Sequence, residues 1–199
     1  MRISGHHSMK NISLPIAVVV AVLLIGGAYY LSTTSKTPAA LFADEALAAE
    51  FDVLSKNGNS SCSASFADSI DTMPDGTRLQ GSCCSPMDPH RYEEQVTGLK
   101  KFKDIPEIPS DPYDIDAGLA KQLKAYYDVE LTPEQQKAYD YAMANSDEKG
   151  PCCCKCWRWY VYGGLAKLLI QKYHFTGEQI TEVWNLSDGC GGAGDHVTH

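Results

Sequence analysis

Beyond residue 37, apolar side chains recur at spacings of about three to five residues, which is the pattern of amphipathic helices. No segment alternates convincingly between apolar and polar positions, so strands are not expected. Turn-forming residues and prolines predict irregular connections at 57–87 and 105–115. The predicted fold class is all-α, with an N-terminal transmembrane helix followed by a small irregular domain of about five or six helices. The predicted helices cover residues 38–57, 88–99, 115–128, 133–144, 150–169 and 176–184.

Two of these helices have strong start signals. Thr132 and Thr176 each precede a glutamine by three residues, at Gln135 and Gln179. In such a capping box the threonine hydroxyl accepts from the third helical amide, and the glutamine side chain accepts from the threonine amide. Pro133 also suits a first helical position. A further helix start is predicted at Gly150-Pro151.

An uncharged apolar stretch covers residues 14–31, and as a helix it would rise about 27 Å, close to the thickness of a bilayer core. Arg2 and Lys10 precede it and acidic residues follow it, so the positive-inside rule predicts a cytoplasmic N-terminus. A cleaved signal peptide and a buried core helix are the alternatives. The predicted organisation is a basic cytoplasmic segment at 1–12, a single-pass signal anchor in the cell membrane at 13–31, a linker at 32–37 and an extracytoplasmic cysteine-rich helical domain at 38–199.

The charge of the chain argues against one class of partner. The net charge is −8, and two of the 17 Lys and Arg residues lie before the apolar stretch, where no acid occurs. The rest of the chain is therefore strongly acidic and is repelled by phosphate backbones. We expect no nucleic-acid binding.

Eight cysteines are the most distinctive chemical feature. Neighbouring cysteines cannot pair comfortably, because a disulfide needs Cα atoms about 4.4–6.8 Å apart with suitably directed side chains. Disulfides alone therefore leave the clustering unexplained, although Cys62 could pair with one member of Cys83-Cys84. The cysteines are Cys62, Cys83, Cys84, Cys152, Cys153, Cys154, Cys156 and Cys190.

Metal binding explains the clustering directly, because thiolate sulfur is a soft ligand that selects Cu(I) or Zn(II). In a helix from Pro151, Cys152 and Cys156 would lie one turn apart, whereas in an extended segment Cys152, Cys154 and Cys156 would point the same way. A helix start and Lys155 would also favour the thiolate. The predicted metal ligands are Cys152, Cys153, Cys154 and Cys156, joined by Cys83, Cys84 and Cys190.

The sequence at 151–156, Pro-Cys-Cys-Cys-Lys-Cys, fits Pro-Cys-x-Cys-x-Cys and resembles the motif of bacterial exported PCYCGC-motif proteins. The resemblance extends loosely into the following helix. It implies an exported cysteine site in which Cys152, Cys154 and Cys156 are the motif cysteines. The chain departs from the motif at Cys153 and Lys155, which replace its tyrosine and glycine.

These observations lead to one hypothesis and two alternatives. The hypothesis is a membrane-tethered, extracytoplasmic, non-enzymatic protein that binds Cu(I) or Zn(II) for buffering or delivery to a metal-handling or redox partner protein. A thiol-disulfide oxidoreductase is the first alternative, since Cys153 and Cys156 have Cys-x-x-Cys spacing. A disulfide-stabilised structural or interaction domain is the second. No serine-hydrolase elbow, phosphate-binding glycine loop or zinc-protease motif occurs in the sequence.

Overall fold

The computed structural model describes residues 42–192, and this part of the chain is mostly helical. Within it lie seven α-helices, two short 3-10 helices and one two-stranded sheet. The α-helices are α2 (Glu45–Asn57), α3 (Ala64–Ser69), α4 (Pro89–Leu99), α5 (Ala117–Tyr126), α6 (Pro133–Asn145), α7 (Trp157–Tyr173) and α8 (Gly177–Ser187). The 3-10 helices are η2 (Ile70–Thr72) and η3 (Lys100–Phe102), and the strands are β1 (Arg78–Gln80) and β2 (Asp114–Asp116).

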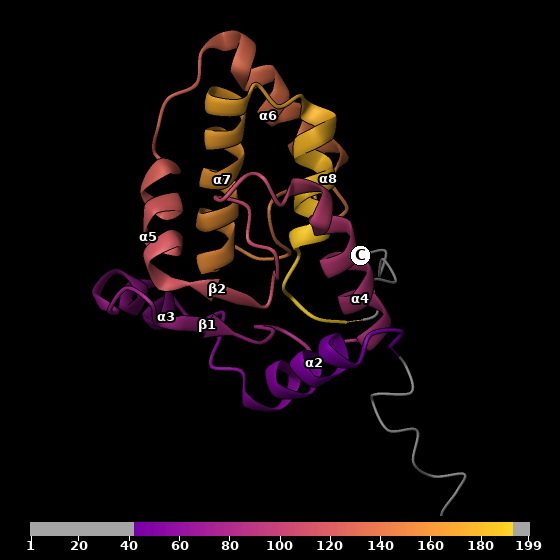
Figure 1. Cartoon of the computed structure of the whole chain (residues 1–199). Coiled ribbons are helices and arrows are strands. Elements are labelled where there is room, and N and C mark those ends of the chain that lie inside the picture. The colour runs from indigo at the N-terminus through magenta and orange to yellow at the C-terminus, as the bar shows by residue number, and fades with distance from the viewer. Residues whose placement is uncertain (1–41, 193–199) are drawn as a thin grey trace, which may run out of the picture.

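Helix α7 forms the centre of the domain (Figure 1). Helices α5, α6, α7 and α8 run alternately up and down, with α5 beside α7, α6 beside α8, and α4 on the outer side of α8. The short β1–β2 sheet, α2 and α3 lie at the end of this bundle where α7 begins. The start of α7 and the end of α8 therefore meet the β1–α4 connection at the same end.

The packing of α7 explains two consecutive glycines in its sequence. Gly163 and Gly164 are buried, and a Cβ on Gly164 would lie only 1.8 Å from the carbonyl oxygen of Leu123 in α5. Glycine in a helix costs roughly 1 kcal/mol relative to alanine. The close approach of α5 requires it here, because an added methyl group would meet rigid backbone.

The helix starts predicted at residues 132 and 176 are confirmed. Thr132 and Thr176 both form complete capping boxes, with Gln135 and Gln179. Two other predictions are wrong in part. Residues 57–87 contain α3, η2 and β1, and β1 pairs antiparallel with β2 through Arg78–Asp116 and Gln80–Asp114. The helix expected from residue 150 begins only at Trp157.

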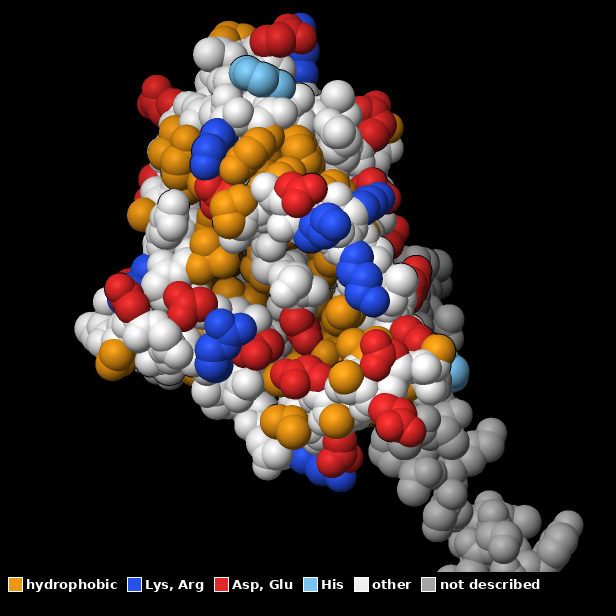
Figure 2. Space-filling view, in the orientation of Figure 1, with side chains coloured by type: hydrophobic (Ala, Val, Ile, Leu, Met, Phe, Trp, Pro, Cys, Tyr) orange, Lys and Arg blue, Asp and Glu red, His pale blue; other side chains and the backbone are white. Residues whose placement is uncertain are grey.

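The predicted membrane anchor at 13–31 lies outside the described residues. Between residues 42 and 192, no helix is both long enough and apolar enough to cross a bilayer. The surface of this part carries interspersed acidic and basic side chains on the face that Figure 2 shows, with hydrophobic groups between them. This face presents no broad basic field of the kind that holds a phosphate backbone.

The close contact of α5 and α7 leads to a stability prediction. Gly164→Ala should destabilise the fold by about 3 kcal/mol, since overpacking against rigid backbone forces the helices apart. Gly98→Ala in α4 is the matched control, because its added methyl meets only the flexible Leu186 side chain. It should change the free energy of unfolding by less than about 1 kcal/mol. Urea denaturation of both variants provides the measurement, and equal effects would contradict the role assigned to Gly164.

Candidate metal centre

All eight cysteine side chains meet at the end of the domain where α7 begins. They arrive on four separate segments: the loop before α3, the loop after β1, the segment between α6 and α7, and the tail after α8. All eight thiols are free in the structure. Residues that are more than one hundred positions apart in the sequence, such as Cys62 and Cys190, therefore belong to one site.

The sulfur atoms form one unbroken network. Seven Sγ–Sγ separations between 2.7 and 3.7 Å connect all eight residues. The shortest are Cys153–Cys190 at 2.7 Å, Cys62–Cys84 at 3.0 Å and Cys152–Cys190 at 3.2 Å. The pairs at 3.7 Å are Cys83–Cys84, Cys84–Cys153, Cys152–Cys156 and Cys154–Cys62. No sulfur lies apart from the others.

Cys62 is positioned by the strand β1. The backbone amides of Asn59 and Ser60 both donate to the carbonyl of Gln80, at 3.0 and 2.9 Å, so the chain before Cys62 follows the edge of the sheet. The indole N–H of Trp157, the first residue of α7, donates to the Ser60 hydroxyl at 3.2 Å. These bonds fix the Cys62 loop against both the sheet and the start of α7.

The tail after α8 is held against the Cys83-Cys84 loop by backbone hydrogen bonds. The amides of Cys83 and Ser85 donate to the carbonyls of Gly189 and Cys190, at 3.4 and 2.9 Å. The Gly192 amide donates to the Pro86 carbonyl at 2.8 Å, next to a parallel bridge between Met87 and Gly192. Cys190 thereby reaches the cluster, and Met87 is a buried packing residue.

The segment 151–156 is a series of bends and not a helix, contrary to the prediction. Successive helical residues point about 100° apart, so a helix would direct the sulfurs of Cys152, Cys153 and Cys154 away from a common point. The bends bring these three sulfurs within 4.8 Å of one another. Cys156 is the N-cap of α7, and its side chain makes no capping bond. Its sulfur therefore remains available to the cluster.

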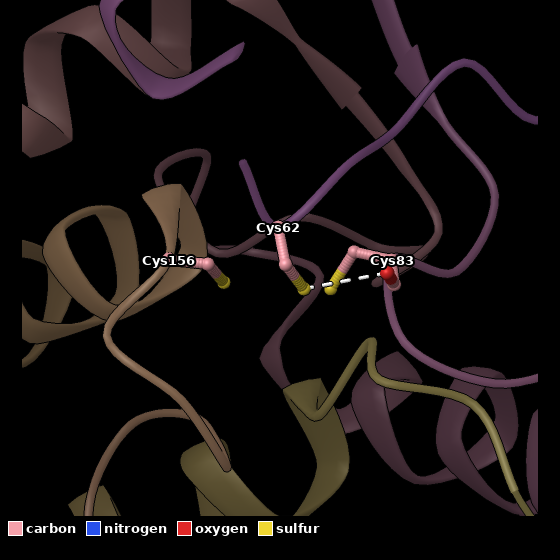
Figure 3. A group of neighbouring side chains, drawn as sticks. All are labelled: Cys62, Cys83 and Cys156. Atoms are coloured by element: carbon pink, nitrogen blue, oxygen red, sulfur yellow. Dashed lines mark hydrogen bonds between the residues drawn. The ribbon is translucent and has the colours of Figure 1, made fainter. Parts of the chain in front are cut away.

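Figure 3 shows how three of the segments meet. Cys62 and Cys83 extend toward each other from their loops, Cys156 reaches toward them from the start of α7, and the three sulfurs lie within 4.8 Å of one another. The Cys62 thiol also donates to the carbonyl oxygen of Cys83 at 3.3 Å. The residues from distant parts of the chain thus form a compact three-sulfur group.

The network has a buried side and an exposed side. Cys152, Cys156 and Cys190 are at most 5% exposed, whereas Cys84 and Cys153 are exposed to solvent. The sulfurs of these two exposed residues lie 3.7 Å apart. The site thus combines an enclosed set of ligands with a rim that an incoming ion or protein can touch.

Mutual contacts spread the thiol pKa values. The pKa of Cys152 is lowered, because the thiols of Cys153, Cys156 and Cys190 donate to its sulfur. The pKa of Cys83 falls to about 6: contact with Cys152 raises it, but contacts with Cys156 and Cys190 and the charge of Arg158 outweigh this effect. Burial and its neighbours raise the pKa of Cys62. The network can therefore form thiolate, the form that binds metals.

The structure brings together all seven cysteines predicted as metal ligands. It adds two residues that were not predicted as ligands. Cys62, interpreted only as a disulfide partner, shares groups with Cys83 and Cys156 and with Cys84 and Cys154. Asp188 shares a group with Cys152 and Cys190. The thiol of Cys62, a soft ligand like those of the other cysteines, was a signal for including it. No sequence pattern distinguished Asp188 from the other acids.

Comparison of the chain with protein families, with curated proteins and with solved structures finds no match.

The docked tail leads to a prediction about Cys190. Gly191 has φ +80°, and a Cβ there would lie 2.2 Å from the Ser85 carbonyl oxygen, so Gly191→Ala should release the tail. Gly76→Ala is the matched control, because Gly76 has φ +84° with nothing within 4 Å. Alkylation of the reduced protein followed by peptide mass spectrometry should find Cys190 protected in the native chain and in the control. It should react at least about tenfold faster in Gly191→Ala. Equal protection in both variants would show that the tail is not held at Gly191.

Proposed function

We propose that this chain is a membrane-tethered, extracytoplasmic thiolate protein that binds Cu(I) for buffering or delivery. The observation that carries the proposal is the convergence of all eight cysteine sulfurs into one network. Three-residue groups of potential ligands occur throughout it. Packing does not require eight sulfurs to meet at one point, two of them exposed, whereas a soft metal ion does.

The sulfur separations support metal coordination. Two sulfurs bound to the same ion at about 2.3 Å in tetrahedral geometry lie about 3.8 Å apart. Four of the separations in the network are 3.7 Å, close to that spacing. Two of these pairs, Cys83–Cys84 and Cys62–Cys154, also belong to a common three-sulfur group. The three shorter separations, among them Cys153–Cys190, would widen when an ion enters.

The ligand set favours Cu(I) over Zn(II). Structural zinc sites are almost always four-coordinate and closed. The groups in this network contain three ligands each, and four of the five groups consist of cysteine alone. Cu(I) is stable with two or three thiolates, so the three-sulfur groups match its coordination. Zn(II) remains the competing ion in the experiment below.

Exchange with a partner protein would take place at the exposed rim. Cys84 and Cys153 are accessible, and their sulfurs contact the more enclosed sulfurs of Cys62 and Cys190. An incoming thiolate could thus displace a rim ligand while the enclosed ligands still hold the ion. A metal-handling protein with its own exposed thiols is the kind of partner that fits this rim.

The redox alternative has one observation in its favour. The shortest Sγ–Sγ distances between different segments join Cys153 to Cys190 and Cys62 to Cys84. An oxidant could convert either pair to a disulfide with little movement of the backbone. The Cys153-x-x-Cys156 spacing does not correspond to such a pair, because Cys153 lies against Cys84 and Cys190, and Cys156 against Cys152. Reversible cycling of these pairs without bound metal would favour the oxidoreductase hypothesis.

The metal-binding proposal predicts that the full-length chain, purified anaerobically with its thiols reduced, retains Cu(I). Replacing Cys152, Cys154 and Cys156 by serine should reduce the metal content several-fold, because it removes ligands from four of the five groups and leaves only Cys83, Cys84 and Cys190 complete. Val53→Ser on the exposed side of α2 is the control and should retain the metal. Elemental mass spectrometry with a free-thiol count provides the measurement. Failure to bind Cu(I) or Zn(II) after anaerobic reconstitution would refute the proposal.

The proposed location predicts a specific topology. If residues 13–31 anchor the chain with its N-terminus in the cytoplasm, a reporter active only outside the cytoplasm should work when fused after residue 199. The same fusion with lysines replacing Val19 and Leu23, within the apolar segment, should lose membrane attachment. Reporter activity and membrane fractionation provide the readouts. A C-terminal reporter active only in the cytoplasm would contradict the proposed location without affecting metal binding.

A further inference from the structure

Given the proposed function, we infer that the eight cysteines hold one polynuclear thiolate-bridged Cu(I) cluster, and that the buried Arg158 guanidinium is its counter-charge. This inference rests on the metal-binding proposal and specifies the number of ions, the bridging role of the sulfurs and a residue outside the ligand set.

The first step concerns the sharing of sulfurs. A mononuclear site takes at most about four thiolates, so eight cysteines could form two separate sites. Separate sites would divide the cysteines into two groups with no common member. Here six of the eight belong to two groups each, as Cys62 does with Cys83–Cys156 and with Cys84–Cys154. A sulfur that belongs to two groups is positioned to bridge two ions.

The number of ions follows from the same sharing. If each of the four groups made of cysteine alone holds one Cu(I) with three sulfurs, the network accommodates about four ions. Eight thiolates with about four monovalent ions carry a net negative charge of about four. About four divalent zinc ions would leave the same ligands close to neutral. The copper cluster therefore requires positive charge nearby, and the zinc cluster does not.

Arg158 places a positive charge inside the protein, next to two of the cysteine-bearing loops. Its side chain is completely buried in the first turn of α7, two residues after Cys156. Its guanidinium donates to the backbone carbonyls of Pro112 and Gly81, the latter at 3.0 Å, while its Nε has no partner. None of the ion pairs between described residues includes it. A buried charge that lacks a paired counter-charge is strongly unfavourable, and Asp188, whose charge acts on Arg158, forms no ion pair with it.

The position of the guanidinium relates it to the cluster. Its acceptor Gly81 lies two residues before Cys83, and Gly189, next to Cys190, is so close that an added Cβ would lie 2.1 Å from Nη1 of Arg158. The cation is thus held between the two cysteine-bearing loops, and it also lies 4.5 Å from the centre of the Trp157 ring. In this enclosed position it is poorly screened by water and acts strongly on nearby anionic sulfurs.

The stoichiometry of the native chain tests the bridging. Cu(I) is titrated anaerobically into the reduced full-length protein, and native mass spectrometry counts the ions bound. About four ions should load cooperatively, with the one-ion species scarce and with the emission typical of Cu(I) ions that share thiolates. One or two ions that load independently would overturn the cluster and leave the proposed function intact. Absence of any Cu(I) binding would overturn both.

Arg158→Met and Arg158→Lys test the counter-charge. Removing the charge should weaken Cu(I) binding at least about tenfold, because the anionic cluster then stays buried without compensation. The lysine variant should recover most of the affinity, and Zn(II) binding should change little in either variant. Unchanged Cu(I) affinity in Arg158→Met would overturn the assignment. If Arg158→Met does not fold, Arg158→Lys decides the question. A lysine variant that folds but binds Cu(I) at least about tenfold more weakly than the native chain would also overturn the assignment, because a positive charge at this position would then not support the cluster.

Discussion

The structure depends on one geometric constraint: eight sulfur atoms carried by four separate segments must reach a single point. Regular secondary structure cannot satisfy it, because a helix or strand directs consecutive side chains away from each other. The cysteines accordingly lie in bends, loops and a helix cap, while the helices around them serve as the scaffold. Helix α7 links the two parts, since its first turn borders the sulfur network and its remaining turns form the core. A rigid centre thus holds an irregular site in place.

The same constraint places thiols and a charged side chain inside the protein, where a charge is unfavourable unless it is compensated. Cys152, Cys156 and Cys190 are continuous with the hydrophobic core, and a fully buried arginine lies beside them. Neutral thiols pack as small hydrophobic groups. Arg158, however, has only two carbonyl oxygens as hydrogen-bond acceptors and two aromatic rings beside it, and it forms no ion pair among the described residues. Binding of ions to the network would then stabilise the fold as well as occupy the site, because ligands that bind only the folded state shift the folding equilibrium.

The parts of the fold that the sequence predicted are those governed by local interactions. The capping boxes at Thr132 and Thr176 need only four neighbouring residues, and both formed as expected. The three-residue strands β1 and β2 are too short to show an alternating pattern. Gly150-Pro151 is a reasonable local helix start, but the convergence of the sulfurs overrides it. Cys62 is isolated in the sequence, so its membership of the cluster depends on hydrogen bonds to Gln80 and Trp157 that no local pattern encodes. The predicted anchor at 13–31 stays a prediction.

The docking of the tail also sets an order in time. Cys190 follows the other seven cysteines and all seven described α-helices along the chain, and hydrogen bonds from residues 189–192 to the loop at 83–87 hold it in the network. A growing polypeptide emerges from the ribosome N-terminus first, so seven thiols are exposed before the eighth exists. An ion captured during synthesis would meet an incomplete set of ligands. The complete set of ligands can exist only after residue 190 has been synthesised, so the site is completed late in the production of the chain.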